Sequence, residues 1–372
     1  MAMPEQAAAT FAGPEESFIV EPYGRGIIHD TYLVRFTRGE DQFILQRINT
    51  QVFKNPEAIM HNLQVISSHV QEKRKSRGAK SYPGWQMVDI IPTREGRNFF
   101  VDPEGGFWRS LSFIRGARPL EKITGINDAL EVGRALGIFH WLFSDLAPGL
   151  LHDTLPGFHN VEQYLTHYDA VSKSGNKVCN DSSFCREFIA ARRGWAPILE
   201  EALRQKKLQL RVIHGDPKIT NIMLDNATGK AVSMIDLDTV MPGPVQYDIG
   251  DCLRSCSNTV GEETADIAAA RFDIERCRAV LSGYMEAARS FLTGRDLDFF
   301  FDAVRLIPYE LGLRFFTDFL ENNVYFKVSS SKQNLERAMV QFKLVESIEE
   351  QEEEIRGIFE ECRVIVTSSK QR

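Results

Sequence analysis

Several features that define common protein classes are missing from this chain of 372 residues. Cysteine is scarce: there are six, none forms a CxxC pair, and none stands with histidines at the spacing of a zinc site. The sequence also has no Walker A loop, no GxSxG motif and no HExxH motif. These absences argue against a disulfide framework and against the chemistries of those three motifs. We expect reduced thiols of a cytoplasmic protein at Cys179, Cys185, Cys252, Cys256, Cys277 and Cys362.

Long hydrophobic runs and an excess of basic residues are lacking too. Because no stretch of about 18 apolar residues occurs, we expect no membrane helix. The net charge of −7 disfavours a general binder of nucleic acid or of anionic membranes. The N-terminus has neither the basic start nor the apolar stretch of a signal peptide, and we expect residues 1–16 to form a disordered tail.

Two hydrophobic patterns divide the chain. Strand-like runs come first, at residues 18–20, 32–36, 43–46, 87–91, 99–101 and 108–114, with a helix that opens at Pro56. Helical patterns follow from residue 127 and recur near 160–171, 183–205, 264–291, 296–322 and 332–363. Strands followed by helices predict an α+β chain with two lobes. We place a five-stranded antiparallel lobe at residues 1–116, a hinge at Gly116 and Pro119, and a larger helical lobe at 117–372.

Residues 214–238 interrupt the helical part with a different pattern. Two short apolar runs, at 222–224 and 231–235, flank a segment of turn-forming residues at 225–229. This order predicts a β-hairpin. Facing residues of paired strands lie roughly 5 Å apart, so polar groups at the two outer ends of the hairpin should meet at its open end.

The polar residues of this segment suit metal-dependent phosphoryl transfer. Asn221 and Asp236 stand at the outer ends of the two runs, and Asp216 lies just upstream. In this chemistry one carboxylate positions the attacking hydroxyl, while an amide oxygen and a second carboxylate hold Mg²⁺ on the nucleotide phosphates. We assign Asp216 to the hydroxyl, Asn221 and Asp236 to the metal, and Lys218 to the phosphate charge. The alternative is a surface hairpin whose polar residues cap turns.

The pattern His-x-Asp-x-x-x-x-Asn followed by Ile-Asp-x-Asp resembles the catalytic and metal loops of the aminoglycoside phosphotransferase and choline kinase group. That resemblance implies a protein-kinase-like fold of two lobes, with ATP and Mg²⁺ as cofactors. The chain is more closely similar to the bacterial N-acetylhexosamine 1-kinases, which implies a sugar as the acceptor. The similar segments are Pro22-Tyr23-Gly24-Arg25-Gly26, Ile44-Leu45-Gln46, Asn49-Thr50, Ile235-Asp236-Leu237-Asp238-Thr239-Val240-Met241-Pro242-Gly243, Gly312-Leu313-Arg314-Phe315 and Tyr325-Phe326.

The resemblance also implies where the nucleotide binds. Gly24 and Gly26 would let backbone amides approach the phosphates, although a tight turn explains them equally well. Kinases of this fold carry a lysine on the third strand, paired with a glutamate on the first helix. Here the lysine position holds Gln46 and the helix position holds Gln64, so the usual positive charge is absent. Either the fold tolerates a neutral contact, or Arg25 or Lys218 supplies the charge.

Other residues are expected to line the adenine and acceptor pockets. Backbone groups from Ser112 to Ile114 should meet the adenine, and Arg314 and Tyr325 should line the sugar pocket. Asp318 lies four residues after Arg314, so the two side chains face one direction on a helix. They form either part of the pocket or an internal ion pair. Asp248 and Asp251 should cap a helix or hold the catalytic loop by hydrogen bonds.

These observations predict a kinase that phosphorylates the anomeric hydroxyl of an N-acetylhexosamine. A kinase of another sugar or of an amino alcohol remains open. The missing lysine also leaves open a catalytically weak, nucleotide-binding pseudokinase, although a pure binder has no need of Asp216, Asn221 and Asp236 together.

Overall fold

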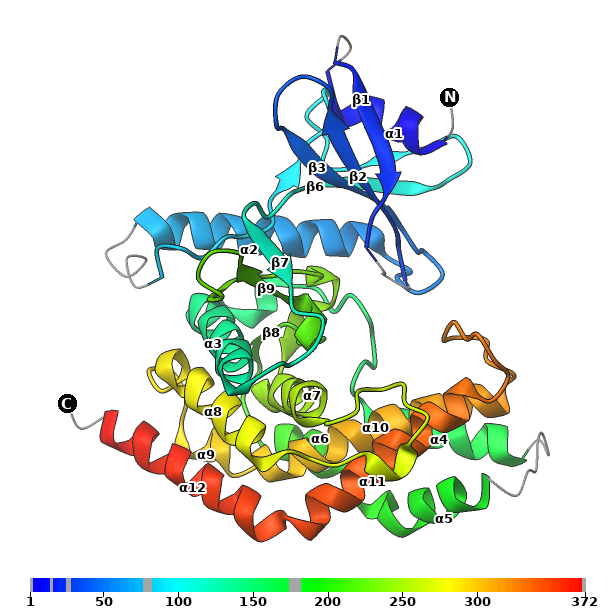
Figure 1. Ribbon diagram of the computed structural model, residues 1–372, viewed down its shortest axis with the longest axis vertical. Helices are drawn as coiled ribbons and strands as arrows, with labels where there is room; N and C mark the ends of the chain where they lie inside the picture. The colour runs from blue at the N-terminus through cyan, green and yellow to red at the C-terminus, as the bar shows by residue number, and fades with distance from the viewer. Residues whose placement is uncertain (1–2, 14–15, 25–27, 76–81, 174–181, 370–372) are drawn as a thin grey trace.

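The computed structural model of the protein describes residues 3–13, 16–24, 28–75, 82–173 and 182–369. A small N-terminal lobe built around a sheet sits on a larger lobe made mostly of helices (Figure 1). The α+β fold with two lobes that the sequence predicts is therefore confirmed.

The sheet of the N-terminal lobe is antiparallel and has the order β1-β2-β3-β6-β4, with β5 also paired to β6. Strands β4 and β5 lie one after the other along the edge of β6 that β3 leaves open. The prediction of five strands was one too few, because two short strands share this edge. The strands are β1 (Phe18–Pro22), β2 (Asp30–Phe36), β3 (Gln42–Ile48), β4 (Ile90–Ile91), β5 (Phe100–Val101) and β6 (Phe107–Ser112).

The N-terminal segment is a helix and not the disordered tail expected from the sequence. Helix α1 (Met3–Phe11) buries Ala7, Ala8 and Phe11. They belong to one apolar cluster with residues of β2, β3 and β6, among them Trp108. Burial of apolar surface against the sheet stabilises a helix that is too short to form alone.

Helix α2 (Pro56–Lys75) lies between the sheet and the helical lobe (Figure 1). Its apolar face places Ile59, Leu63, Ile66 and Val70 in a cluster that continues into the helical lobe. The two lobes thus share one hydrophobic core through α2.

The predicted hairpin is present at the centre of the molecule. Strands β9 (Ile222–Asp225) and β10 (Ala231–Met234) pair in antiparallel register, with Met234 opposite Ile222. Strand β7 (Ala117–Pro119) adds to the free edge of β9 directly after the chain leaves the N-terminal lobe. A second small sheet pairs β8 (Arg211–Ile213) with β11 (Met241–Gly243). These two sheets position the segment that contains the candidate active site.

The helical lobe is built around a close contact between α3 and α8. A Cβ at Gly133 of α3 would lie 1.8 Å from the Val280 carbonyl oxygen, and one at Gly283 of α8 would lie 2.0 Å from that of Leu130. Glycine at these positions lets the two backbones touch. The helices are α3 (Ile126–Phe143), α4 (Val161–Lys173), α5 (Ser182–Arg192), α6 (Ile198–Arg204), α7 (Val245–Ser257), α8 (Ile274–Ala288), α9 (Gly294–Leu297), α10 (Phe300–Leu320), α11 (Gln333–Glu350) and α12 (Glu352–Ser369), with short 3-10 turns η2 (Pro148–Leu150), η3 (Arg193–Trp195), η4 (Ile219–Asn221), η5 (Leu237–Thr239) and η6 (Ile267–Ala269).

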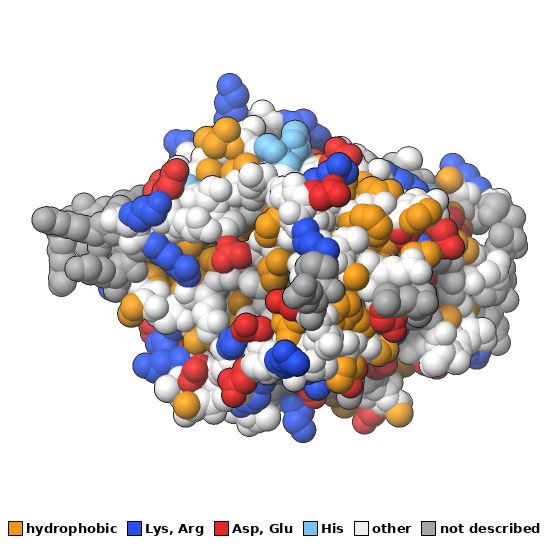
Figure 2. All heavy atoms as spheres, turned by 90° about the horizontal axis from the view of Figure 1, so that it is seen from above, with side chains coloured by type: hydrophobic (Ala, Val, Ile, Leu, Met, Phe, Trp, Pro, Cys, Tyr) orange, Lys and Arg blue, Asp and Glu red, His pale blue; other side chains and the backbone are white. Residues whose placement is uncertain are grey.

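The distribution of surface charge, the character of the helices and the state of the cysteines can be compared with the composition. Acidic and basic side chains are interspersed on the face seen from above the N-terminal lobe (Figure 2). Across the described ranges, no helix is both long and apolar enough to cross a membrane. The five cysteines in these ranges are free and buried, while Cys179 lies outside them.

Candidate active site

The catalytic loop starts where β8 ends, and helix α7 holds it from behind. Asp248 on α7 accepts hydrogen bonds from the backbone N–H groups of His214, at 2.7 Å, and Gly215, at 2.8 Å. Gly215 has φ +84°, and a Cβ there would lie 2.6 Å from the carbonyl oxygen of Thr239. A side chain at this position would be strained and crowded. The prediction that Asp248 holds the loop is confirmed.

A buried pair of side chains supports Asp248 in turn. His140 of α3 contacts the Asp248 carboxylate at 2.9 Å through Nε2 and the Tyr284 hydroxyl of α8 at 2.9 Å through Nδ1. Burial favours the neutral acid, but the contact with His140 nevertheless keeps the pKa of Asp248 below its ordinary value. A chain of polar contacts therefore runs from Tyr284 of α8 through His140 of α3 and Asp248 to the catalytic loop.

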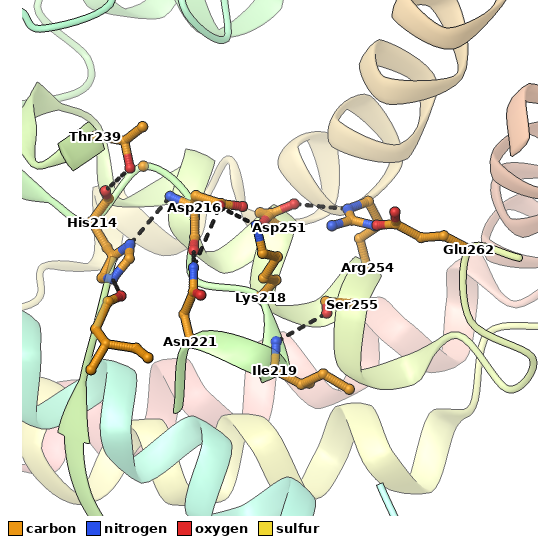
Figure 3. Close-up of polar contacts among 12 residues, drawn as sticks. His214, Asp216, Lys218, Ile219, Asn221, Thr239, Asp251, Arg254, Ser255 and Glu262 are labelled. Carbon is orange, nitrogen blue, oxygen red and sulfur yellow. Dashed lines mark hydrogen bonds and ion pairs between the residues drawn. The ribbon is translucent and has the colours of Figure 1, made fainter. Parts of the chain in front are cut away.

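Asp216 lies at the centre of the loop, between Lys218 and Asn221 (Figure 3). Its Oδ2 is 2.5 Å from Lys218 Nζ and 3.4 Å from Asn221 Nδ2. Burial alone would raise the pKa of Asp216, but the Lys218 ammonium lowers it below its ordinary value. The side chain is 27% exposed, so part of this ionised carboxylate is open to solvent.

His214 buttresses this loop and is not placed to act as the base. Its Nδ1 accepts a hydrogen bond from the Asp216 backbone N–H at 3.3 Å. The proton of the neutral ring therefore sits on Nε2, which donates to the Ile235 carbonyl oxygen at 3.1 Å. The imidazole thus ties the catalytic loop to the end of the hairpin, in agreement with the supporting role expected from the sequence.

The open end of the hairpin brings Asn221 and Asp236 together. The N–H of Ile235 donates to the Asn221 carbonyl oxygen at 2.9 Å, so the next residue, Asp236, lies beside Asn221. Asp236 has the left-handed backbone conformation, φ +65°, and its residue surface is exposed in the cleft. The protein packed around it raises its pKa, and repulsion from Asp238 and Asp216 adds to that effect, although Lys218 opposes it. Repulsion between carboxylates that share a site is relieved when a cation binds there.

The oxygen ligands offered by Asn221 and Asp236 suit magnesium better than a metal whose ligands must all come from the protein. Within the described residues, no group of three or more His, Cys, Asp and Glu side chains is arranged to hold a metal. Magnesium needs only one or two carboxylates and takes its remaining oxygens from phosphates and water. Asn221 and Asp236 fit that requirement.

Asp251 has a different role from the one expected. Its carboxylate accepts from Arg254 Nε at 2.8 Å, and a second nitrogen of Arg254 donates to Glu262 at 2.6 Å. The loop that Asp251 was predicted to hold is instead bonded by Asp248, one turn earlier on α7. Asp251 nevertheless lies beside Asp216 and Lys218 in Figure 3, and burial and repulsion from Asp216 raise its pKa.

The predicted nucleotide-binding residues lie in the N-terminal lobe and where the chain leaves it. Gly24 lies in the turn after β1 with φ +75°, whereas Gly26 and Arg25 lie outside the described residues. Ile114 is buried in the core below the sheet. The backbone N–H of Ser112 donates to the Asp89 carbonyl oxygen at 2.8 Å, so this amide is engaged within the protein. This N–H is therefore not available to an adenine. Other backbone groups of residues 112–114 remain for that contact.

Gln46 contacts an arginine that sequence reasoning did not single out. Arg109 on β6 is directly opposite Gln46 on β3 in the strand register. The Gln46 side-chain oxygen accepts from Arg109 at 3.0 Å and 2.7 Å, and its amide nitrogen donates to Thr31 at 3.1 Å. Gln64 does not complete the pair expected from the family, because it accepts from Asn98 at 3.1 Å. Strand pairing was the signal in the sequence that could have identified Arg109.

Arg314 of α10 lies among aromatic rings. Its guanidinium carbon is 5.0 Å from the ring centroid of Tyr164 and 5.9 Å from that of Tyr325. The rings of Phe158 and Phe326 lie at 5.3 Å and 5.6 Å. Burial would lower the pKa of Arg314, but neighbouring groups, including Tyr164, Glu310 and Asp216, raise it. The structure thus places Tyr325 beside Arg314, and Arg314 within electrostatic range of Asp216.

Asp318 was expected to line the acceptor pocket or to pair with Arg314, and it does neither. It is buried and accepts from the backbone N–H of Tyr325 at 2.7 Å and of Phe326 at 3.0 Å. The side chain of Asn334 donates to it at 2.8 Å. The carboxylate is thus bonded by backbone amides, which sequence spacing does not reveal. Through these bonds Asp318 holds the loop that contains Tyr325.

His159 and Glu310 were also missed. The two ring nitrogens of His159 contact two oxygens, that of the Gly215 carbonyl at 2.8 Å and that of the Glu310 carboxylate at 3.1 Å. Glu310 is in turn 3.5 Å from Arg314, one helical turn later on α10. A continuous polar chain therefore joins Arg314 to the residue before Asp216.

Comparison with known proteins agrees with this geometry. Residues 19–281, more than half of the chain, match the family described as "Phosphotransferase enzyme family". The chain belongs to this family.

Several solved structures have a similar fold. A microcompartment-associated aminopropanol kinase has 16% identity and a TM-score of 0.62, over 94% of this chain and 97% of that one. A choline kinase from Cryptosporidium parvum Iowa II has 14% identity and a TM-score of 0.60, over 92% of this chain and 91% of that one. The GDP complex of aminoglycoside 2'-phosphotransferase-IIIa has 15% identity and a TM-score of 0.56, over 88% of this chain and 94% of that one. At these identities the likeness shows the fold alone.

Proposed function

We propose that this phosphotransferase is an ATP- and magnesium-dependent kinase that phosphorylates the anomeric hydroxyl of an N-acetylhexosamine. The main support is the convergence of Asp216, Lys218, Asn221 and Asp236 at the open end of the hairpin. Asp216 orients the acceptor hydroxyl and accepts its proton, while Lys218 faces the transferring phosphoryl group. Asn221 and Asp236 hold the magnesium ion, which neutralises phosphate charge when it is bound.

The nucleotide belongs in the cleft between the sheet and the catalytic loop. Gly24 and Gly26 are proposed to admit the phosphates, and the segment from Ser112 to Ile114 to border the base. Support for a nucleotide comes from the family and from the GDP complex of a protein with the same fold.

The surroundings of Arg314 favour an uncharged acceptor that is rich in hydroxyl groups. Aromatic rings can bind a cationic head group such as choline, but here the guanidinium already occupies the space among four rings. A second cation beside it would be repelled. Within the described residues, the polar partner of Arg314 is Glu310 at 3.5 Å, which leaves donors for a neutral ligand. The resemblance of the segments around Arg314 and Tyr325 to N-acetylhexosamine 1-kinases points to the same class of acceptor.

An amino alcohol is the second candidate acceptor, because the aminopropanol kinase and the choline kinase share this fold. Purified protein with ATP and Mg²⁺ should be offered N-acetylglucosamine, N-acetylgalactosamine, choline, ethanolamine and aminopropanol, with Asp216→Asn as the inactive control. Phosphorus NMR before and after mild acid identifies the product, since a glycosyl phosphate is acid-labile and an ordinary ester is stable. An acid-stable product, or a product from the amines alone, would reject the sugar 1-kinase assignment and leave the kinase assignment standing.

A further inference from the structure

The chain lacks the strand lysine of its relatives, yet a buried positive charge lies beside the position where the lysine would stand. Arg109 is opposite Gln46 in the sheet, and its side chain is 1% exposed. A guanidinium so completely buried cannot reach a nucleotide in the cleft. Its function must be exerted through the groups that it contacts inside the protein.

The partner of Arg109 is Asp238, in the segment that follows the metal residue. Arg109 contacts one carboxylate oxygen of Asp238 at 2.6 Å through one terminal nitrogen and the other oxygen at 2.9 Å through the second. One of these contacts is a hydrogen bond and the other an ion-pair contact, and together they fix the Asp238 carboxylate next to β6 inside the protein. The contact joins β6 of the N-terminal lobe to η5, which begins one residue after Asp236.

His29 completes the environment of Asp238. The backbone N–H of Asn49 donates to His29 Nδ1 at 3.0 Å, so Nε2 bears the proton of the neutral ring and donates to Asp238 at 2.7 Å. The Thr154 hydroxyl donates to the Asp238 backbone carbonyl at 2.6 Å. Side chain and backbone of Asp238 are thus both held.

We infer that Arg109 is a positioning residue that takes over the structural part of the missing lysine's role. Arg109 holds Asp238 against the sheet. This contact fixes the left-handed backbone at Asp236 and so orients the Asp236 carboxylate toward the proposed metal position. In kinases of this fold the lysine joins the third strand to a helix and to the phosphates. Here Arg109 joins the sheet directly to the segment 236–239, and Gln46 orients Arg109 through its hydrogen bonds. The inference rests on the proposed role of Asp236 in holding magnesium.

The test separates positioning from stability with three variants. Arg109→Met leaves Asp238 buried without its cationic partner and with His29 as its remaining side-chain contact, so its Tm should fall by roughly 10 °C. Arg109→Met/Asp238→Asn removes both charges and keeps an acceptor for His29, so it should regain about half of that loss. Arg192→Met is the matched control, because Arg192 makes a two-pronged contact with Glu349 between α5 and α11, remote from the cleft in Figure 1.

The decisive measurement is the affinity for ADP with Mg²⁺ and with EDTA, by isothermal titration. In both Arg109 variants the Kd for Mg²⁺–ADP should rise about tenfold, while the Kd for ADP in EDTA should stay within about twofold. Arg192→Met should lower Tm and leave both affinities unchanged.

Two results would overturn the inference alone: a stable double variant with wild-type affinity for Mg²⁺–ADP, or an equal loss of affinity in Arg192→Met. A wild-type protein whose ADP affinity does not respond to Mg²⁺ would instead reject the proposed metal site, and the inference with it.

Discussion

Two arginines border the catalytic loop, and their surroundings are opposite in kind. Arg109, on β6 of the N-terminal lobe, is 1% exposed and its guanidinium contacts the oxygens of Gln46 and Asp238. Arg314, on α10 of the helical lobe, is 15% exposed, and its carboxylate partner Glu310 lies 3.5 Å away. Aromatic faces surround Arg314 where acids and amides surround Arg109.

The difference shows how the same side chain serves structure in one place and recognition in another. A guanidinium that is 1% exposed is out of reach of a ligand, and removing it takes the ion-pair partner away from a buried carboxylate. A guanidinium that is held by ring faces keeps its in-plane N–H groups free for hydrogen bonds. We therefore expect Arg109 to govern stability and the metal loop, and Arg314 to govern acceptor binding.

The largest effect should come from Asp216, which lies in the catalytic loop between the regions of Arg109 and Arg314. Asp216→Asn should lower kcat by about 10³-fold, within the usual range for loss of a general base, because the amide cannot accept the hydroxyl proton. The asparagine oxygen can still accept from Lys218, and both side chains of this pair are partly exposed, so Tm and Mg²⁺–ADP affinity should change little. Steady-state kinetics and thermal melting test this. Near-normal turnover in the variant would mean that another group acts as the base.

The next largest effect separates Asp236 from Asp238, two acids in one short segment. Asp236→Ala should lower kcat/KM for ATP by about 10²-fold, because several kcal/mol of phosphate charge neutralisation depend on the metal. Its Tm should hold or rise, since a repelled carboxylate is removed. Asp238→Asn should lower Tm instead, because it breaks the pair with Arg109. The reverse pattern would move the metal site to Asp238.

Arg314→Met should have a smaller effect, confined to the acceptor. Loss of one or two hydrogen bonds to the acceptor should reduce kcat/KM for the acceptor by about 10- to 100-fold, with the KM for ATP unchanged. Stability should fall by only about 1 kcal/mol from the lost ring contacts. Arg356→Met is a suitable control, since Arg356 stacks on Phe301 at 4.1 Å and is 51% exposed. An increase in the KM for ATP in the Arg314 variant would place Arg314 on the nucleotide side.

The parts of the site that were predictable depend on short stretches of chain. Alternating strands and a turn segment are enough to place Asn221 beside Asp236, and the hairpin was confirmed. The loop contacts of Asp248 followed from its place at a helix start close behind that hairpin. In each case local periodicity determines which groups meet.

The parts that were not predictable depend on contacts between distant residues. Arg109 and Asp238 are 129 residues apart in sequence, and only the register of β3 against β6 indicates that Gln46 has a charged neighbour. Helix α1 was missed because its nine residues are too few to form a helix alone, and its contact with the sheet is not visible in the local sequence. Asp318 bonds to backbone amides, which no side-chain pattern encodes.

The smallest effect concerns pH and the His159–Glu310 pair behind Arg314. Both ring nitrogens of His159 face oxygen acceptors, so the charged imidazolium satisfies both contacts. Burial would lower the pKa of His159, but Glu310 and, further away, Asp251 raise it. Tyr247 stacks on the ring at 4.9 Å, and Arg314 lies on the far side of Glu310.

The sign of the pH dependence follows from this raised pKa. A histidine with a raised pKa in the folded state contributes stability that is complete below its unfolded pKa and is lost as pH rises through the folded value. Glu310→Gln should therefore be less stable than the wild type by a margin that is largest near pH 6 and shrinks at alkaline pH. Because Glu310 also orients Arg314, the KM for the acceptor should rise about two- to fivefold. Glu321→Gln is the matched control, since it breaks an exposed contact with His167 and should show no such trend. Thermal melts from pH 6 to pH 9 decide the question: a margin that grows with pH would mean that His159 is neutral in the folded protein.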